Sequence, residues 1–115
     1  MPDEKERSAR VCELNDAFRK DPTRFGRAVV TRGVNEFGPV FVLLATRAVA
    51  AFDAFNEDND PYGEHDFGSF QLDGKKLFWK IDAYEKGSNY EAGAETPDNP
   101  ATTDRILTIM LADEY

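Results

Sequence analysis

Residues 65–84 have the sequence HDFGSFQLDGKKLFWKIDAY, and this stretch decides the fold. Asp73-Gly74 stands between two strand-like segments, which predicts a β-hairpin with arms at 65–72 and 75–84. Successive side chains of a strand point to opposite faces of the sheet. One face of the second arm is therefore apolar, and we expect it to pack on helices; it carries Leu77, Trp79, Ile81 and Ala83.

The opposite face of that arm carries two further aromatic residues, Phe78 and Tyr84. Exposed aromatic side chains on a sheet are well suited to anchor a protein interface. The alternative is that a helix or a loop covers both faces of the hairpin. The pattern favours neither, so both residues remain candidates for a binding surface.

The residues before the hairpin predict two helices and a short strand. Apolar residues fall at helical spacing over 4–20, and Asp21-Pro22 ends that helix because proline cannot continue it. A short strand is expected at 27–31. Pro39 suits a first helical position, so a second and more buried helix is expected over 39–55. Its broad apolar stripe consists of Val40, Leu43, Leu44, Ala48, Ala51, Phe52 and Phe55.

The residues after the hairpin predict a loop and a last strand. Residues 85–104 are polar and contain two prolines, which is typical of a long loop. Residues 105–111 are apolar on both faces and favour a central strand over a short helix capped by Thr103 or Asp104. The prediction is one α+β domain over 1–115, in the order α-β-α-β-β-β, with two helices packed on one face of a small, mainly antiparallel sheet. Residues 1–5 are expected to be disordered.

Charge is unevenly distributed along the 115 residues. Residues 1–50 carry 7 acids and 9 bases, whereas residues 51–115 carry 15 acids and 5 bases. Such an excess repels nucleic-acid phosphates, because their binding needs lysine and arginine. It attracts basic protein surfaces, although it also serves solubility alone. We therefore expect no direct nucleic-acid ligand. The sequence also contains no glycine-rich phosphate loop, and no cofactor is expected.

Two features that the sequence lacks bear on where in the cell the protein is expected. No apolar run approaches the length of a membrane span, and no apolar stretch follows the charged first residues, so we expect no membrane association and no secretory signal. Cys12 is the only cysteine, which excludes an intrachain disulfide. These features predict a cytoplasmic protein, with Cys12 as a small core residue.

An acidic connector precedes the hairpin and contains the clearest candidates for a site. Asp58, Asp60, Glu64 and Asp66 lie within nine residues, with His65 among them. Their oxygens suit a hard cation, but the spacing lacks the bidentate glutamate that ends a calcium loop. Asp and Asn side chains also bond backbone amides in turns, and this structural role is the one we favour. A metal site and a catalytic role for the only histidine, His65, are the alternatives.

A family resemblance is carried by four segments. They are Phe52-Asp53-Ala54-Phe55, the acidic run from Asn56 to Gly68, Phe78-Trp79-Lys80-Ile81-Asp82, and Arg105 to Ala112. With Leu14 to Arg19 of the first helix, they resemble the bacterial domain-of-unknown-function family 3768 from about Leu14 to Tyr115. The resemblance implies a small bacterial protein, mainly of alphaproteobacteria and of mobile elements. It implies no catalytic or binding residue.

The functional expectation is a non-catalytic module that binds a protein partner with a basic surface. In a mobile-element setting, such a module would be an inhibitor whose carboxylates imitate nucleic-acid phosphates, of the anti-restriction or anti-CRISPR type. The expected binding residues are Asp58, Asp60, Tyr62, Glu64, Asp66, Phe78, Tyr84, Glu91 and Glu95. A homodimer is a further arrangement that we consider. The alternative function is a metal-assisted hydrolase or nuclease, with Asp58, Asp60, Glu64, His65 and Asp66 as ligands.

Overall fold

The hairpin forms where its turn predicts it. In the computed structural model, which describes residues 3–115, strand β2 (Phe67–Leu72) pairs antiparallel with strand β3 (Lys75–Glu85). Asp73 and Gly74 both have positive φ, 52° and 74°, as a two-residue hairpin turn of the favoured hand requires. The central prediction of the sequence is therefore confirmed.

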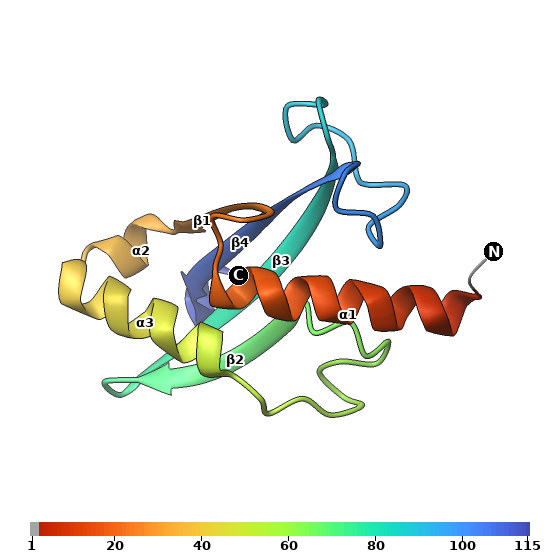
Figure 1. Cartoon of the computed structure of the whole chain (residues 1–115). Coiled ribbons are helices and arrows are strands. Elements are labelled where there is room, and N and C mark those ends of the chain that lie inside the picture. The colour runs from red at the N-terminus through yellow and green to blue at the C-terminus, as the bar shows by residue number, and fades with distance from the viewer. Residues whose placement is uncertain (1–2) are drawn as a thin grey trace.

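The sheet has four strands in the order β1-β4-β3-β2 (Figure 1). Strand β4 (Thr103–Leu111) pairs antiparallel with β3, and strand β1 (Gly26–Val30) pairs parallel with β4. A Cβ atom at Gly26 would lie 1.7 Å from the carbonyl oxygen of Arg105, so only glycine allows this approach. The α+β class is confirmed, and the sheet is mixed but mostly antiparallel.

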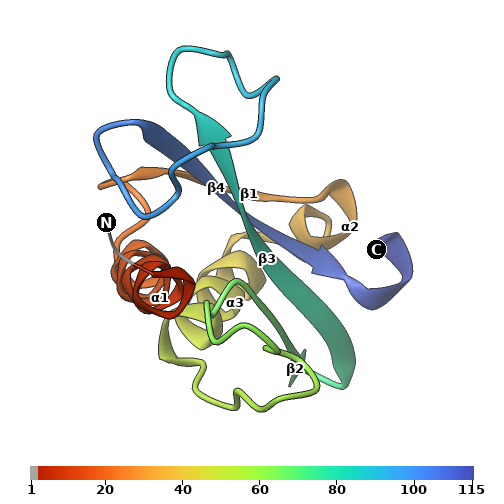
Figure 2. The ribbon, with the colours of Figure 1, turned by 90° about the vertical axis from the view of Figure 1, so that its right-hand side faces the viewer.

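Helix α1 (Glu4–Lys20) and helix α3 (Pro39–Ala51) pack on the same face of the sheet (Figure 2). The side chain of Asp3 caps α1 by accepting a 2.8 Å hydrogen bond from the amide of Glu6. The core between helices and sheet consists of Phe18, Val34, Phe41, Ala45, Val49, Leu77, Trp79, Ile81, Leu107 and Ile109. The predicted order of helices and strands and the predicted apolar face of β3 are both confirmed.

Two short helices were not predicted. Helix α2 (Arg32–Asn35) follows β1, and the 3-10 helix η1 (Ala112–Glu114) follows β4. Glu114 joins them, because its carboxylate accepts hydrogen bonds from the Thr31 hydroxyl at 2.6 Å and from the Gly33 amide at 3.1 Å. These contacts lower the pKa of Glu114. The acid thus ties the end of the chain to the segment after β1.

The prediction of which side of the second helix is buried is wrong. Helix α3 ends at Ala51, not at residue 55, and it buries Phe41, Ala45 and Val49. Val40, Leu43, Leu44 and Ala51 of the expected stripe are exposed instead, and Val40 is 69% exposed. Phe52 and Phe55 lie beyond the end of the helix and do pack against the core. The helix is apolar on nearly every side, so periodicity could not select its buried face. Ala45 is small and fully buried, consistent with close packing of the helix on the core.

The expected disorder and the expected loop also differ from the structure. Of residues 1–5, Met1 and Pro2 lie outside the described residues, whereas Asp3 caps α1 and Glu4 and Lys5 are helical. The loop is shorter than expected, because β3 extends to Glu85 and β4 begins at Thr103. Residues 86–102, here called the long loop, fold back on the end of β3 through hydrogen bonds such as that from the Ala94 amide to the Ala83 carbonyl.

Candidate functional site

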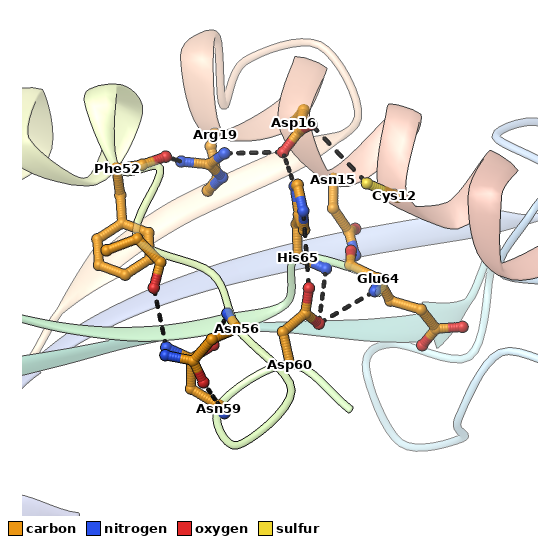
Figure 3. A network of polar contacts seen from close by, with 11 residues as sticks. Cys12, Asn15, Asp16, Arg19, Phe52, Asn56, Asn59, Asp60, Glu64 and His65 are labelled. Carbon is orange, nitrogen blue, oxygen red and sulfur yellow. Dashed lines mark hydrogen bonds and ion pairs between the residues drawn. The ribbon is translucent and has the colours of Figure 1, made fainter. Parts of the chain in front are cut away.

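A polar network joins α1 to the connector, residues 56–66, and is centred on His65 (Figure 3). Nδ1 of His65 lies 2.9 Å from Oδ1 of Asp16, and Nε2 lies 3.6 Å from Oδ2 of Asp60. Each ring nitrogen therefore faces a carboxylate. Asp16 comes from the fourth turn of α1, so the network connects residues 49 positions apart in the chain.

A backbone turn within the connector positions His65. Oδ1 of Asp60 accepts hydrogen bonds from the amides of Glu64 and His65, each at 3.1 Å. Asn56 in the same way accepts from the amides of Asp58 and Asn59. His65 has a positive φ of 54°, and its ring stacks on Phe55 at 3.7 Å between centroids. The turn-forming role expected of these acids and amides is observed, and it fixes the plane of the imidazole.

Arg19 continues the network into the core. Its Nη2 donates to Oδ1 of Asp16 at 2.7 Å, and its Nη1 donates to the carbonyls of Val49 at 2.6 Å and Phe52 at 3.0 Å. Those carbonyls lie at the C-terminus of α3, where a positive charge is favourable. The guanidinium also lies over the Trp79 ring, 5.1 Å from its centroid. One buried cation thus connects α1, α3, the connector and the sheet.

The charges of the network shift the ionisation of its members. Burial alone raises the pKa of the Asp16 carboxyl, but hydrogen bonds from Arg19 and His65 and their positive charge outweigh it and lower that pKa. Cys12 lies one helical turn before Asp16, with its Sγ 3.9 Å from Oδ2 of Asp16. Burial, followed by the nearby charges of Asp16 and Asp60, raises the pKa of the Cys12 thiol to about 11.

The raised pKa predicts an unreactive thiol. Because the thiolate is the reacting form, iodoacetamide should modify Cys12 at neutral pH at least about tenfold more slowly than a cysteine in an unfolded peptide. The rate should keep rising with pH towards about 11. Mass spectrometry of the intact chain over time measures both. A rate that levels off at or below the ordinary thiol value of 9.0 would contradict this description of Cys12.

The structure separates most of the predicted metal ligands. Asp58 is exposed, Asp60 is turned inward to the amides and to His65, and Glu64 accepts a hydrogen bond from the Ser8 hydroxyl at 3.2 Å. Within residues 3–115, no three of the five expected ligands bring their donor atoms within 4.8 Å of one another. The group that does so is Cys12, Asp16 and His65, of which the sequence analysis had named only His65 as a ligand.

Several carboxylates of the connector nevertheless lie close enough to repel each other. Burial raises the pKa of Glu64, and the charges of Asp66 and Asp60 add to the effect. Burial also raises the pKa of Asp66, with Asp60 and Asp82 contributing. The carboxylates of the connector and of the adjacent part of β3 are therefore close enough for their negative charges to act on one another.

The remaining predicted binding residues lie in two places. Tyr62 in the connector is 78% exposed, and Glu91 and Glu95 are exposed on the long loop. Phe78 and Tyr84 are half-buried and face away from the helices, on the open side of the sheet. There Phe78 packs against Phe67 and Tyr115 at one end of the strand, and Tyr84 packs against Tyr90 near the other.

Sequence reasoning missed the buried cations. A charged residue such as Arg19 is expected at the surface, but Arg19 is only 3% exposed. Arg105 is fully buried and donates from Nε to Oδ1 of Asn15 at 2.8 Å, and burial lowers its pKa. The only available signal was that Arg19 follows Phe18 and Arg105 precedes Ile106, so each basic residue adjoins an apolar position of its own element.

Fold and site together define a small α+β protein in which helices cover one face of a mixed sheet and acidic segments flank the first helix. The chain belongs to the family described as protein of unknown function DUF3768, whose model matches residues 30–114. The resemblance is thereby confirmed over that range, which includes the connector and the hairpin but not α1. Neither the curated proteins nor the solved structures contain a match to the chain. In residues 3–115, no helix combines the length and the apolar character that crossing a membrane requires.

Proposed function

We propose that the protein is a non-catalytic binding module that docks on a basic protein surface through its acidic end. The acidic end is defined as the connector, residues 56–66, and the long loop, residues 86–102. These two segments contain eight acidic residues and one lysine. Figures 1 and 2 show them on either side of the first half of α1, at the end of the molecule where this helix begins.

The observation that carries the proposal is the lack of internal compensation for this charge. Of the 15 acids in residues 51–115, only four form an ion pair with a residue of the described chain, namely Asp60, Asp73, Asp82 and Asp98. Only the Arg7–Asp98 contact, at 3.9 Å, brings a base from the first half of the chain to one of these acids. The other eleven acids have no ion-pair partner among the described residues, and those that are exposed, such as Asp58, Glu91 and Glu95, are available to a basic partner, whose approach they would accelerate.

A hollow between the two acidic segments suits a basic side chain. It has a volume of about 350 Å³ and lies beside α1, with the exposed ring of Tyr62 on one wall and Glu64 and Asp98 on others. An aromatic face attracts a lysine or arginine cation, and carboxylates complete such a site. Contacts from Arg7 to Asp98 and from Ser8 to Glu64 hold the walls to the helix.

The narrower form of the proposal concerns the partner. A protein surface that is basic because it binds nucleic-acid phosphates would also attract this arrangement of carboxylates. The protein would then act as an inhibitor that competes with the nucleic acid. This form rests on the charge and on the mobile-element setting that the family resemblance implied.

Binding of a fluorescent oligoarginine peptide tests the proposal. Replacing three exposed and unpaired acids of the acidic end, as Asp58→Asn, Glu91→Gln and Glu95→Gln, should weaken binding about tenfold or more at low salt. Fluorescence anisotropy measures the affinity. The matched control neutralises three exposed acids elsewhere, Glu36→Gln, Asp53→Asn and Asp113→Asn, and should change it less than about twofold. Equal weakening by both triple variants would show that only net charge matters and would refute a defined acidic end.

A further inference from the structure

The residues Cys12, Asp16 and His65 have the donor atoms of a transition-metal site. Their sulfur, oxygen and nitrogen donors all lie within 4.8 Å of one another, and each side chain is half-buried. Sγ of Cys12 is 3.9 Å from Oδ2 of Asp16, and Nδ1 of His65 is 2.9 Å from Oδ1 of the same carboxylate. Around a tetrahedral zinc ion, neighbouring donors of these types are about 3.3–3.5 Å apart. The Sγ–Oδ2 spacing is a few tenths of an ångström longer than that geometry, and the Nδ1–Oδ1 spacing is a few tenths shorter. The two spacings involve different oxygens of Asp16, so the side chains would have to rotate slightly to share one ion.

Helix geometry explains why two of the three donors converge. Cys12 and Asp16 are four residues apart on α1 and therefore lie on the same face of the helix, one turn from each other. His65 reaches them from the connector, because the turn around Asp60 fixes its backbone and Phe55 stacks on its ring. No rearrangement of the backbone is needed to bring the donors together.

The groups behind the donors are those that a metal site requires. A histidine ligand usually donates its second ring N–H to a carboxylate, and Nε2 of His65 faces Oδ2 of Asp60 at 3.6 Å. A carboxylate ligand is itself usually hydrogen-bonded, and Arg19 donates to Oδ1 of Asp16 at 2.7 Å, which leaves Oδ2 directed to Cys12. Asp60 and Arg19 would therefore orient the ligands without binding the ion.

A hollow of about 500 Å³ opens beside this group and is lined by Asp16, Arg19, Phe55 and His65, among others. It gives Asp16 and His65, two of the three ligands, access to solvent from one side. Three protein ligands with a fourth position open to water distinguish catalytic zinc sites from closed structural ones. Thiolate and imidazole ligands also select zinc-like ions over calcium and magnesium, which prefer oxygen.

We propose that Cys12, Asp16 and His65 bind one zinc-class divalent metal ion, with its fourth position open to this hollow. The site is separate from the acidic connector ligands that the sequence suggested, and it does not depend on the proposed docking function. Because Cys12 and Asp16 precede residue 30, it also combines a segment outside the family match with one inside it.

Cobalt substitution tests this site in the full chain under reducing conditions. Titration with Co²⁺ should produce visible d–d bands of tetrahedral intensity and a near-ultraviolet thiolate-to-cobalt band that saturate at one equivalent, and Zn²⁺ should displace both. Cys12→Ser should abolish the thiolate band, and Asp16→Asn should weaken the affinity at least about tenfold. Glu13→Gln, an exposed acid beside Cys12 whose carboxylate pairs with Arg10 and lies outside the group, is the control and should leave the spectrum unchanged.

Thermal melting provides a second measurement that does not depend on spectroscopy. Saturating Zn²⁺ should raise the melting temperature of the wild-type chain and of Glu13→Gln, because binding to the native state stabilises it, and should leave that of Cys12→Ser unchanged. The proposal is overturned if the thiolate band is absent from the wild-type chain, or if Cys12→Ser binds Co²⁺ as tightly as the wild type.

Discussion

Replacement of Arg19 by methionine is expected to lower the free energy of unfolding by about 4 kcal/mol. Methionine keeps the apolar length of the side chain but removes a guanidinium that is 3% exposed. The change leaves the carbonyls of Val49 and Phe52 without their donor and removes one of the two groups that hold Asp16. Unfolding in urea, followed by circular dichroism, measures the loss.

The matched control is Arg10→Met on the same helix. Arg10 is exposed and forms an ion pair with Glu13 at 3.0 Å, which typically contributes less than about 1 kcal/mol. The two variants make the same chemical change, so the difference between them isolates burial and the contacts of Arg19. Equal and small losses for both would mean that the network around Arg19 does not connect the helices energetically.

Trp79→Ala is the other substitution with a large expected effect, a loss of about 4 kcal/mol. Trp79 is fully buried at the centre of β3 and packs against Phe52 and Phe55 in edge-to-face geometry, with ring centroids 5.5 Å and 6.1 Å away. Its removal opens a cavity beneath both helices that the neighbouring rings cannot fill. Urea unfolding monitored by circular dichroism measures the loss, since the variant lacks the only tryptophan.

Trp79→Phe separates ring volume from polarity at the same position. The Nε1 atom of Trp79 is buried and has no hydrogen-bond partner among the described residues, so phenylalanine removes no hydrogen bond. We expect it to cost about 1–2 kcal/mol, much less than alanine. A loss as large as that of alanine would show that the indole nitrogen has a partner that this structure does not contain.

Local signals predicted the elements that local chemistry determines. The Asp73-Gly74 turn and the two-residue period of β3 identified the hairpin and the side of Trp79 that faces the core. Asp21-Pro22 correctly marked the end of α1 at Lys20. These features depend on a few adjacent residues, and their backbone preferences are strong enough to be visible without tertiary contacts.

Contacts between distant residues could not be predicted in the same way. The parallel pairing of β1 with β4 joins strands that lie far apart in the chain, so no local pattern fixes which residues pair. The side of α3 that is buried depends on which other elements the helix packs against. The candidate metal group was missed for the same reason, because His65 meets Asp16 across 49 positions. The connector and the turn-forming role of its acids were predicted, since Asp60 accepts hydrogen bonds from the amides of Glu64 and His65, but the contact of Asp60 with the His65 ring was not.

The central claim, that the acidic end is a defined docking surface, is tested most directly by mapping where a basic probe binds. Amide chemical shifts of the nitrogen-15-labelled chain should be recorded while an oligoarginine peptide is added at low salt. We predict that the changes concentrate in residues 56–66 and 86–102 and in the first half of α1, and that added salt reverses them. Changes spread evenly over the surface, or confined to the open face of the sheet around Phe78, would contradict it.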